Sequence, residues 1–335
     1  MSELLQGLND KQKEAVLATE GPCLVIAGAG SGKTKVLTHK IAYLISEKNV
    51  KPYNILAITF TNKAASEMKQ RVEKLVGDVA QEMWMGTFHS ICVRILRRFI
   101  DRIGFDTSFL IFDTSDQKTV VKECLKALNI DDKTFSDRSV LSEISNAKNE
   151  MLTPKAYQAK YSGEFRKEKI GQVYELYQKR LRENNAIDFD DIINYTIDIL
   201  SENPDVLQYY TEKFKYVLVD EYQDTNKAQF TLVTILASRY GNITVVGDND
   251  QGIYSFRGAD ISNILNFEKD FPGTKIIKLE QNYRCTGNIL KAANAVIKHN
   301  ENKYEKKLWT ENEDGSLPCL YQAEDEYDEA NYVVK

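Results

Sequence analysis

The sequence lacks several features that would assign the protein to a class at once. It has no run of about 18 apolar residues, so we expect no helix that spans a membrane. Its N-terminus has no basic stretch followed by an apolar one, which argues against a signal peptide and favours a cytoplasmic protein. The five cysteines form no CxxC pair and the three histidines are dispersed, which argues against a zinc site and a disulfide framework.

Positive charge is also scarce. The net charge is −5, which taken alone argues mildly against nucleic-acid binding. The deficit is uneven, because residues 311–330 contain eight acidic residues and no lysine or arginine, and the rest of the chain is therefore net positive. A path for DNA would have to be a local groove and not the whole surface.

A glycine-rich turn lies between a predicted strand, Cys23–Ala27, and a predicted helix, Thr34–Ile45. The turn reads AGAGSGKT and matches the phosphate-binding P-loop, except that Ala27 stands where the first glycine is usual. In such a loop the lysine, here Lys33, reaches the β- and γ-phosphates, and the threonine, here Thr34, ligates Mg²⁺. A glycine-rich turn that arose by chance is the alternative. The predicted nucleotide-binding residues of the loop are Ala27, Gly28, Ala29, Gly30, Ser31, Gly32, Lys33, Thr34 and Lys35.

Acidic and amide side chains follow two further predicted strands. The short apolar run Tyr216–Val219 ends in Asp220, which we expect to hold Mg²⁺, and in Glu221, which we expect to act as general base and to belong to the metal-binding set with Thr34 and Asp220. Gln251 follows the strand NITVV, where it would sense the γ-phosphate or the attacking water. A solvated acidic turn is the alternative for the pair of carboxylates. Because parallel strands present their carboxyl ends at one edge, these groups are expected to converge there.

A set of motifs resembles the PcrA/UvrD/Rep family of superfamily 1 DNA helicases. The motifs occur in the family's order and extend over most of the chain. The matching blocks are LNDKQKEAV (8–16), AGAGSGKT (27–34), AITFTNKAASEM (57–68), GTFHSICVRILRR (86–98), VDEYQDTN (219–226), VVGDNDQGIYSFRGAD (245–260) and LEQNYR (279–284).

The resemblance implies further roles around the nucleotide. Gln12 resembles the glutamine that reads the adenine edge, and Tyr283 resembles the tyrosine that stacks on the base. Arg284 resembles an arginine finger that stabilises the charge of the γ-phosphate and belongs, with Lys33, Glu221 and Gln251, to the implied catalytic set. An ordinary surface arginine is the alternative for Arg284. The resemblance thus implies ATP and Mg²⁺ as cofactors.

The resemblance also implies binding of single-stranded DNA and duplex junctions, through base stacking on aromatic rings and contacts with the DNA backbone. IYSFRG is expected to be an extended segment with alternating aromatic rings, although Phe256 stands where the family usually has the larger tryptophan. From the residues alone, core packing is an equally good prediction for Phe60 and Phe256. The implied DNA-binding residues are Phe60, Thr61, Asn62, His89, Tyr254, Phe256 and Arg257.

We predict an α/β fold of the RecA-like P-loop NTPase type, with a parallel sheet, helices on both faces and an inserted all-helical subdomain. Residues 1–112 and 191–278 are expected to form motor domain 1, and 113–190 the helical insertion. Residues 279–335 are expected to begin a truncated motor domain 2, with an amphipathic helix near the end. Asp188, Asp190 and Asp191 suggest either a metal site or, the preferred interpretation, acids at a helix N-terminus.

The function that these patterns favour is an ATP-dependent 3′→5′ DNA helicase or translocase of replication, repair or recombination, in a bacterial-type, nucleoid-associated setting. Because the second motor domain is expected to be incomplete, we expect this chain alone to bind nucleotide, to hydrolyse it slowly and not to unwind DNA. Two alternatives remain open. One is a non-motor, ATP-dependent DNA-binding or regulatory module, and the other is the ATPase part of a helicase–nuclease.

Overall fold

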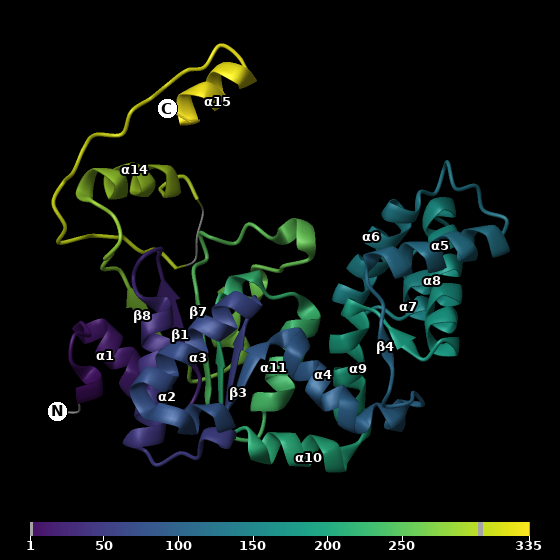
Figure 1. The fold of residues 1–335 in the computed structure, drawn as a ribbon, viewed down its shortest axis with the longest axis horizontal. Coiled ribbons are helices and arrows are strands. Elements are labelled where there is room, and N and C mark those ends of the chain that lie inside the picture. Colours follow the sequence, from purple (N-terminus) through teal and green to yellow (C-terminus); the bar gives the residue numbers. More distant parts are fainter. Residues whose placement is uncertain (1–2, 301–303, 335) are drawn as a thin grey trace.

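A computed structural model describes residues 3–300 and 304–334 of the chain. Its central feature is a six-stranded parallel sheet with the strand order β3-β2-β6-β7-β1-β8 (Figure 1). The predicted α/β class with a parallel sheet is therefore confirmed. The strands are β1 (Cys23–Ala27), β2 (Ile55–Thr59), β3 (Trp84–Thr87), β6 (Tyr216–Val219), β7 (Ile243–Gly247) and β8 (Lys275–Leu279).

Both faces of the sheet are covered, because successive side chains of a strand point to opposite sides. In β1, Leu24 and Ile26 pack into one buried cluster, and Cys23, Val25 and Ala27 pack into the other. The helices of the first cluster include α4 (Phe88–Phe99), α9 (Phe189–Glu202), α10 (Pro204–Lys213) and α11 (Lys227–Ala237). The helices of the second are α1 (Asp10–Leu17), α2 (Lys33–Ser46) and α3 (Asn62–Val76).

The carboxyl ends of the parallel strands meet at one edge of this sheet. Ala27 of β1 lies in register with Leu279 of β8, and Ile26 lies in register with Gly247 of β7. The P-loop, the turn after β7 and the segment after β8 therefore start side by side. This register is what brings distant parts of the sequence to one site.

A helical insertion lies to one side of the sheet and has its own buried cluster, which includes Val121, Ile144, Tyr177 and Leu181 (Figure 1). The chain enters and leaves the insertion through a parallel pair of short strands, β4 (Leu110–Ile111) and β5 (Ala186–Ile187). The domain boundaries themselves stay a prediction. The helices are α5 (Thr114–Ala127), α6 (Asp137–Asn149), α7 (Pro154–Lys160) and α8 (Phe165–Glu183).

The acidic cluster before α9 is a helix N-terminus, as the preferred interpretation expected. Asp188 is the N-cap, and its side chain forms a capping box with Asp191. Both carboxylates also pair with the buried ammonium of Lys148 in α6, at 2.6 Å and 2.7 Å. Among the described residues, no group of three or more His, Cys, Asp or Glu side chains could hold a metal ion.

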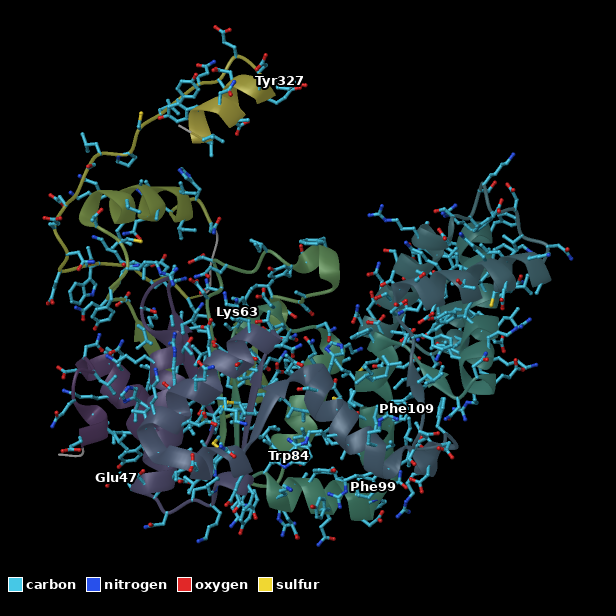
Figure 2. All side chains as sticks on the ribbon, viewed as in Figure 1. Glu47, Lys63, Trp84, Phe99, Phe109 and Tyr327 are labelled. Carbon is cyan, nitrogen blue, oxygen red and sulfur yellow. The ribbon has the colours of Figure 1, made fainter. Side chains whose placement is uncertain are left out.

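The remaining elements are short or peripheral. Tyr327 marks α15, which lies apart from the other helices and has no buried described residue (Figure 2). In the described parts of the chain, no helix is long and apolar enough to span a membrane. The other helices are α12 (Ser262–Leu265), α13 (Phe267–Asp270), α14 (Gly287–Ile297) and α15 (Glu326–Val334). The 3-10 helices are η1 (Glu3–Leu5), η2 (Pro52–Asn54), η3 (Gly77–Glu82), η4 (Ile100–Ile103), η5 (Tyr222–Asp224) and η6 (Ser255–Arg257).

Candidate nucleotide and DNA site

The P-loop joins β1 to α2 and leaves the N-terminus of α2 without a side-chain cap. Two of its glycines have positive φ angles, 69° at Gly30 and 88° at Gly32, a conformation that suits glycine. Ser31 folds back on the loop, and its hydroxyl donates to the carbonyl of Gly28 at 2.7 Å. The first N–H groups of α2 have no intrahelical acceptor and suit an anion. The loop therefore fits a phosphate.

The lysine of the loop is paired with the predicted general base. The Nζ of Lys33 lies 2.8 Å from Oε2 of Glu221, and the Lys33 side chain is 11% exposed. Asp220 is buried, and its carboxylate forms a hydrogen bond with Thr34. Burial, followed by the charge of Glu221, raises the pKa of Asp220 to about 6. A divalent cation on Asp220 and Thr34 would relieve this electrostatic cost, and their oxygens suit Mg²⁺.

Glu221 lies in a strained backbone position, with a φ of 48° that non-glycine residues seldom adopt. Its Oε2 also accepts a hydrogen bond from Nε2 of Gln223 at 3.0 Å. The Oε1 of Gln223 accepts from the backbone N–H of Asp248 at 3.0 Å. Gln223 therefore joins the turn after β6 to the turn after β7.

Gln251 lies in that second turn and is held by an acidic neighbour. Its Nε2 donates to Oδ2 of Asp248 at 2.5 Å, and its backbone N–H donates to the carbonyl of the same residue at 2.9 Å. These two contacts fix the orientation of the Gln251 side chain. Its role as a phosphate sensor stays a prediction.

The residues expected at the adenine end gather on the other side of the P-loop. Gln12 is buried, and its Nε2 donates to the carbonyl of Ser31 at 2.9 Å. Asn9 forms a capping box with Gln12, and its Nδ2 donates to the hydroxyl of Tyr283 at 2.8 Å. Tyr283 is 49% exposed, so part of its ring is accessible for stacking. The side chain of Lys35 reaches the segment before α1, where its Nζ donates to the carbonyl of Gly7 at 2.7 Å.

Arg284 is brought to the P-loop by its neighbours. The N–H of Tyr283 donates to the carbonyl of Gly30 at 2.9 Å, and Nδ2 of Asn282 donates to the carbonyl of Ala29 at 2.7 Å. A Cβ built on Gly30 would lie 2.7 Å from the Cβ of Arg284. The Arg284 residue is exposed, and no acidic side chain of the described residues pairs with it. Its contact with a phosphate stays a prediction.

The three residues after β2 have different surroundings. Phe60 is partly buried against the sheet, with its ring 5.5 Å from that of Phe88 in an edge-to-face arrangement. Thr61 caps α3 by accepting from the N–H of Ala64 at 3.1 Å. Asn62 is exposed at the first position of α3. Phe60 therefore packs only partly into the core, and its contact with DNA stays a prediction.

The IYSFRG segment differs from the prediction. Its residues 255–257 form a 3-10 turn and not an extended segment, because the N–H of Gly258 closes on the carbonyl of Ser255 at 2.9 Å. Phe256 is 74% exposed, so the core-packing alternative is wrong for this residue. Its ring centroid lies 6.0 Å from that of Tyr254. The side chain of Arg257 lies outside the described part of the structure.

His89 lies on α4 beside the insertion. Burial lowers its pKa, which favours the neutral imidazole. Its ring lies 5.7 Å from that of Phe189. His89 and Phe256 line one cavity of about 350 Å³ together with Asn149 and Asn226. A neutral ring at this place suits stacking or hydrogen bonding with a nucleotide more than attraction to a phosphate.

One cleft of about 630 Å³ connects the two predicted sites. Its lining includes Phe60, Thr61 and Tyr254, which are expected to contact DNA, as well as Glu221 and Gln251, which are expected to act on ATP. Parallel strands and their register place these residues at one edge of the sheet.

Sequence reasoning missed four contacts at this edge. Asn282 and Gln223 lie inside the quoted motifs, but nothing in the spacing shows that they connect separate turns. Leu308 lies over the P-loop, where its side chain would clash with a Cβ at Gly28. Lys306 pairs with Asp248 at 2.5 Å. Both come from a stretch to which no motif drew attention.

Family models define the class of the protein. The UvrD/REP helicase N-terminal domain matches residues 8–272, and the UvrD-like helicase C-terminal domain matches residues 277–335. The chain therefore belongs to the UvrD/REP helicase family, as its motifs indicated.

Individual relatives agree with the family. The chain is 58% identical over all of its 335 residues to the ATP-dependent DNA helicase PcrA of Staphylococcus epidermidis strain RP62A, of which it covers 46%. It is 57% identical over the same length to the protein of that name from Staphylococcus aureus strain Mu50, again covering 46%. The chain thus spans less than half the length of these curated relatives.

Proposed function

We propose that the protein is an ATP-dependent DNA helicase that moves 3′→5′ along single-stranded DNA in replication, repair or recombination. Duplex junctions would be its substrates, and it would act in the bacterial cytoplasm on the nucleoid. The observation that carries the proposal is the shared cleft, in which Glu221 and Gln251 face the same space as Phe60 and Tyr254. The chain covers 46% of the length of the PcrA relative from Staphylococcus epidermidis. The proposed activity is therefore that of the whole protein and not of this chain alone.

In this proposal the chain's own residues prepare the phosphate for hydrolysis. Lys33 and Glu221 form an ion pair at 2.8 Å. The β- and γ-phosphates would compete for Lys33, so that Glu221 is released to orient a water molecule and accept its proton. Attack of that water on the γ-phosphorus breaks the bond to the β-phosphate oxygen. Mg²⁺ held by Asp220 and Thr34 would neutralise phosphate charge.

Arg284 and Gln251 complete the proposed site from two directions. Arg284 follows β8 and would stabilise the charge that develops on the γ-phosphate. Gln251 follows β7 and would report the state of that phosphate to the turn with Tyr254 and Phe256. The binding of a DNA base stacked on these rings would then depend on whether ATP or its hydrolysis products occupy the nucleotide site.

The test is the reciprocal effect of the two ligands on each other. Affinity for a fluorescent oligothymidine is measured by anisotropy with and without a non-hydrolysable ATP analogue, and affinity for the analogue is measured with and without the DNA. We expect each ligand to change the affinity for the other by the same factor. Independent binding of the two ligands would contradict coupling through the cleft and would favour a DNA-binding module that is not a motor.

A further inference from the structure

Residues 304–309, which we call the strap, cross the edge of the sheet beside the nucleotide site. The N–H of Trp309 donates to the carbonyl of Glu280 at 3.0 Å, and the N–H of Asn282 donates to the carbonyl of Trp309 at 2.7 Å. The strap therefore pairs with the segment that carries Arg284. Leu308 covers the P-loop at Gly28. No role was predicted for the strap from the sequence.

Lys306 of the strap is buried in an acidic site. Its side chain is 4% exposed, and its Nζ lies 2.5 Å from Oδ1 of Asp248. The same Nζ pairs with Asp250 and lies 3.3 Å from Oδ1 of Asn249. The carboxylates of Asp248 and Asp250 are 4% and 7% exposed. Burial of three charges costs free energy that their mutual attraction need not recover, so stability alone is a weak reason for this cluster.

Asp248 shares its two oxygens between the strap and the predicted sensor. One oxygen pairs with Lys306, and the other accepts from Nε2 of Gln251 at 2.5 Å. The backbone N–H of Asp248 donates to Gln223, which in turn donates to Glu221. A continuous set of polar contacts therefore runs from the strap to both the sensor glutamine and the general base.

We propose that Lys306 is a positioning residue for ATP hydrolysis, which orients Gln251 through Asp248 and makes that orientation depend on where the strap lies. The inference rests on the proposed function. Lys306 directs its charge into the turn after β7, although Glu280 and Glu305 line a pocket together with it. Without Lys306, the buried carboxylate of Asp248 would lose its ion pair, and the turn after β7 would lose its contact with the strap. Gln251 would then lose its fixed partner.

The test compares Lys306→Met with Lys307→Met in the full 335-residue chain. Lys307 is the adjacent lysine and is exposed, so its substitution controls for loss of one charge from the strap. Single-turnover hydrolysis of ATP measures the chemical step, and binding of a fluorescent ATP analogue measures affinity. We expect Lys306→Met to lower the single-turnover rate about 10- to 100-fold while leaving the dissociation constant within about threefold. Lys306→Arg should restore part of the rate.

Trp309 supplies a second readout that does not depend on hydrolysis. It is 47% exposed, whereas the only other tryptophan, Trp84, is 5% exposed. Acrylamide therefore quenches mainly Trp309, and quenching should increase in Lys306→Met and stay unchanged in Lys307→Met. If Lys306→Met fails to fold, the double variant Lys306→Met/Asp250→Asn, which also removes the charge of one of the two carboxylates paired with Lys306, is tested in its place.

A normal rate in Lys306→Met would overturn the inference, even if Trp309 became more accessible, because Lys306 would then only fasten the strap. The inference would also be overturned if the dissociation constant for the ATP analogue rose enough to account for the whole loss of the hydrolysis rate. If the unsubstituted chain did not bind ATP, the proposed nucleotide site would be contradicted and the inference would fall with it. No substitution at Lys306 can produce that result, so the two failures are distinguishable.

Discussion

The ammonium of Lys33 and the carboxylate of Glu221 lie 2.8 Å apart, so an ion pair joins the P-loop to the turn after β6. The pair holds two groups that are expected to act separately during hydrolysis. Lys33 would bind phosphate, and Glu221 would accept a proton from water. Nucleotide binding and activation of the base are therefore expected to be one event.

The first prediction concerns Glu221→Gln. The substitution removes the base and weakens the hold on Lys33, so we expect nucleotide affinity to stay equal or increase while hydrolysis falls about 100-fold or more. Single-turnover hydrolysis and binding of a fluorescent ATP analogue measure the two effects. Glu47→Gln is the matched control, because Glu47 is exposed at the far end of α2 (Figure 2). A loss of nucleotide affinity as large as the loss of the hydrolysis rate would show that Glu221 supports nucleotide binding and does not act as a base.

The second prediction concerns Phe256→Ala. Because Phe256 is 74% exposed, its removal should not change folding, but it should weaken binding of single-stranded DNA by about 1–3 kcal/mol. Phe165 is 71% exposed on the helical insertion, so Phe165→Ala controls for the loss of an exposed ring. Anisotropy titrations with oligothymidine supply the measurement. Equal affinity of the two variants for DNA would rule out Phe256 as a stacking platform.

The third prediction concerns the stability cost of Asp220. Its pKa is about 6 in the folded protein because of burial, compared with about 3.9 in an unfolded chain. The folded state therefore binds this proton more tightly, and the cost of the buried charge grows as the pH rises from about 4 to about 6. We expect Asp220→Asn to raise the free energy of unfolding by about 1–3 kcal/mol at pH 7.5, with little gain at pH 4.

Urea unfolding without Mg²⁺ at the two pH values measures this difference. A gain that is independent of pH would mean that Asp220 does not carry the raised pKa. A loss of stability at pH 7.5 would mean that the hydrogen bond with Thr34 outweighs the cost of burial.

The fourth prediction concerns Lys148, which is 1% exposed and compensates Asp188 and Asp191. Lys148→Met leaves both carboxylates buried and unpaired, so we expect a loss of about 3–5 kcal/mol in the free energy of unfolding. Lys122→Met, at a position 68% exposed in α5, should change stability by less than about 1 kcal/mol. Similar denaturation midpoints for the two variants would disprove a structural role of the buried pair.

The sequence predicted those parts of the site that depend on short motifs. The P-loop, the strand before Asp220 and the α/β class follow from spacing within a few residues, because glycine conformation and strand periodicity are local properties. Asp188 was likewise assigned to a helix N-terminus. Its counterion Lys148, 40 positions away, was not predictable, because tertiary packing alone joins α6 to α9.

The parts of the site that the sequence did not predict depend on how strands pair in the sheet, on how turns close and on which segments pack together. Asn282 reaches the P-loop only because β8 pairs with β1. The 3-10 turn at Phe256 depends on a left-handed conformation at Gly258, which the alternation of aromatic residues does not reveal. Lys306 looks like an ordinary charged residue in a polar stretch until the fold places it against Asp248.

The most direct test of the account is ATP turnover by this chain with and without single-stranded DNA, beside Arg284→Ala. Arg239→Ala is the control, because Arg239 is a surface residue paired with Glu212. The account predicts that DNA stimulates turnover and that Arg284→Ala lowers the single-turnover rate at least about 100-fold, with little change in nucleotide affinity. Hydrolysis that proceeds equally well without the Arg284 guanidinium would contradict a site completed by the segment after β8.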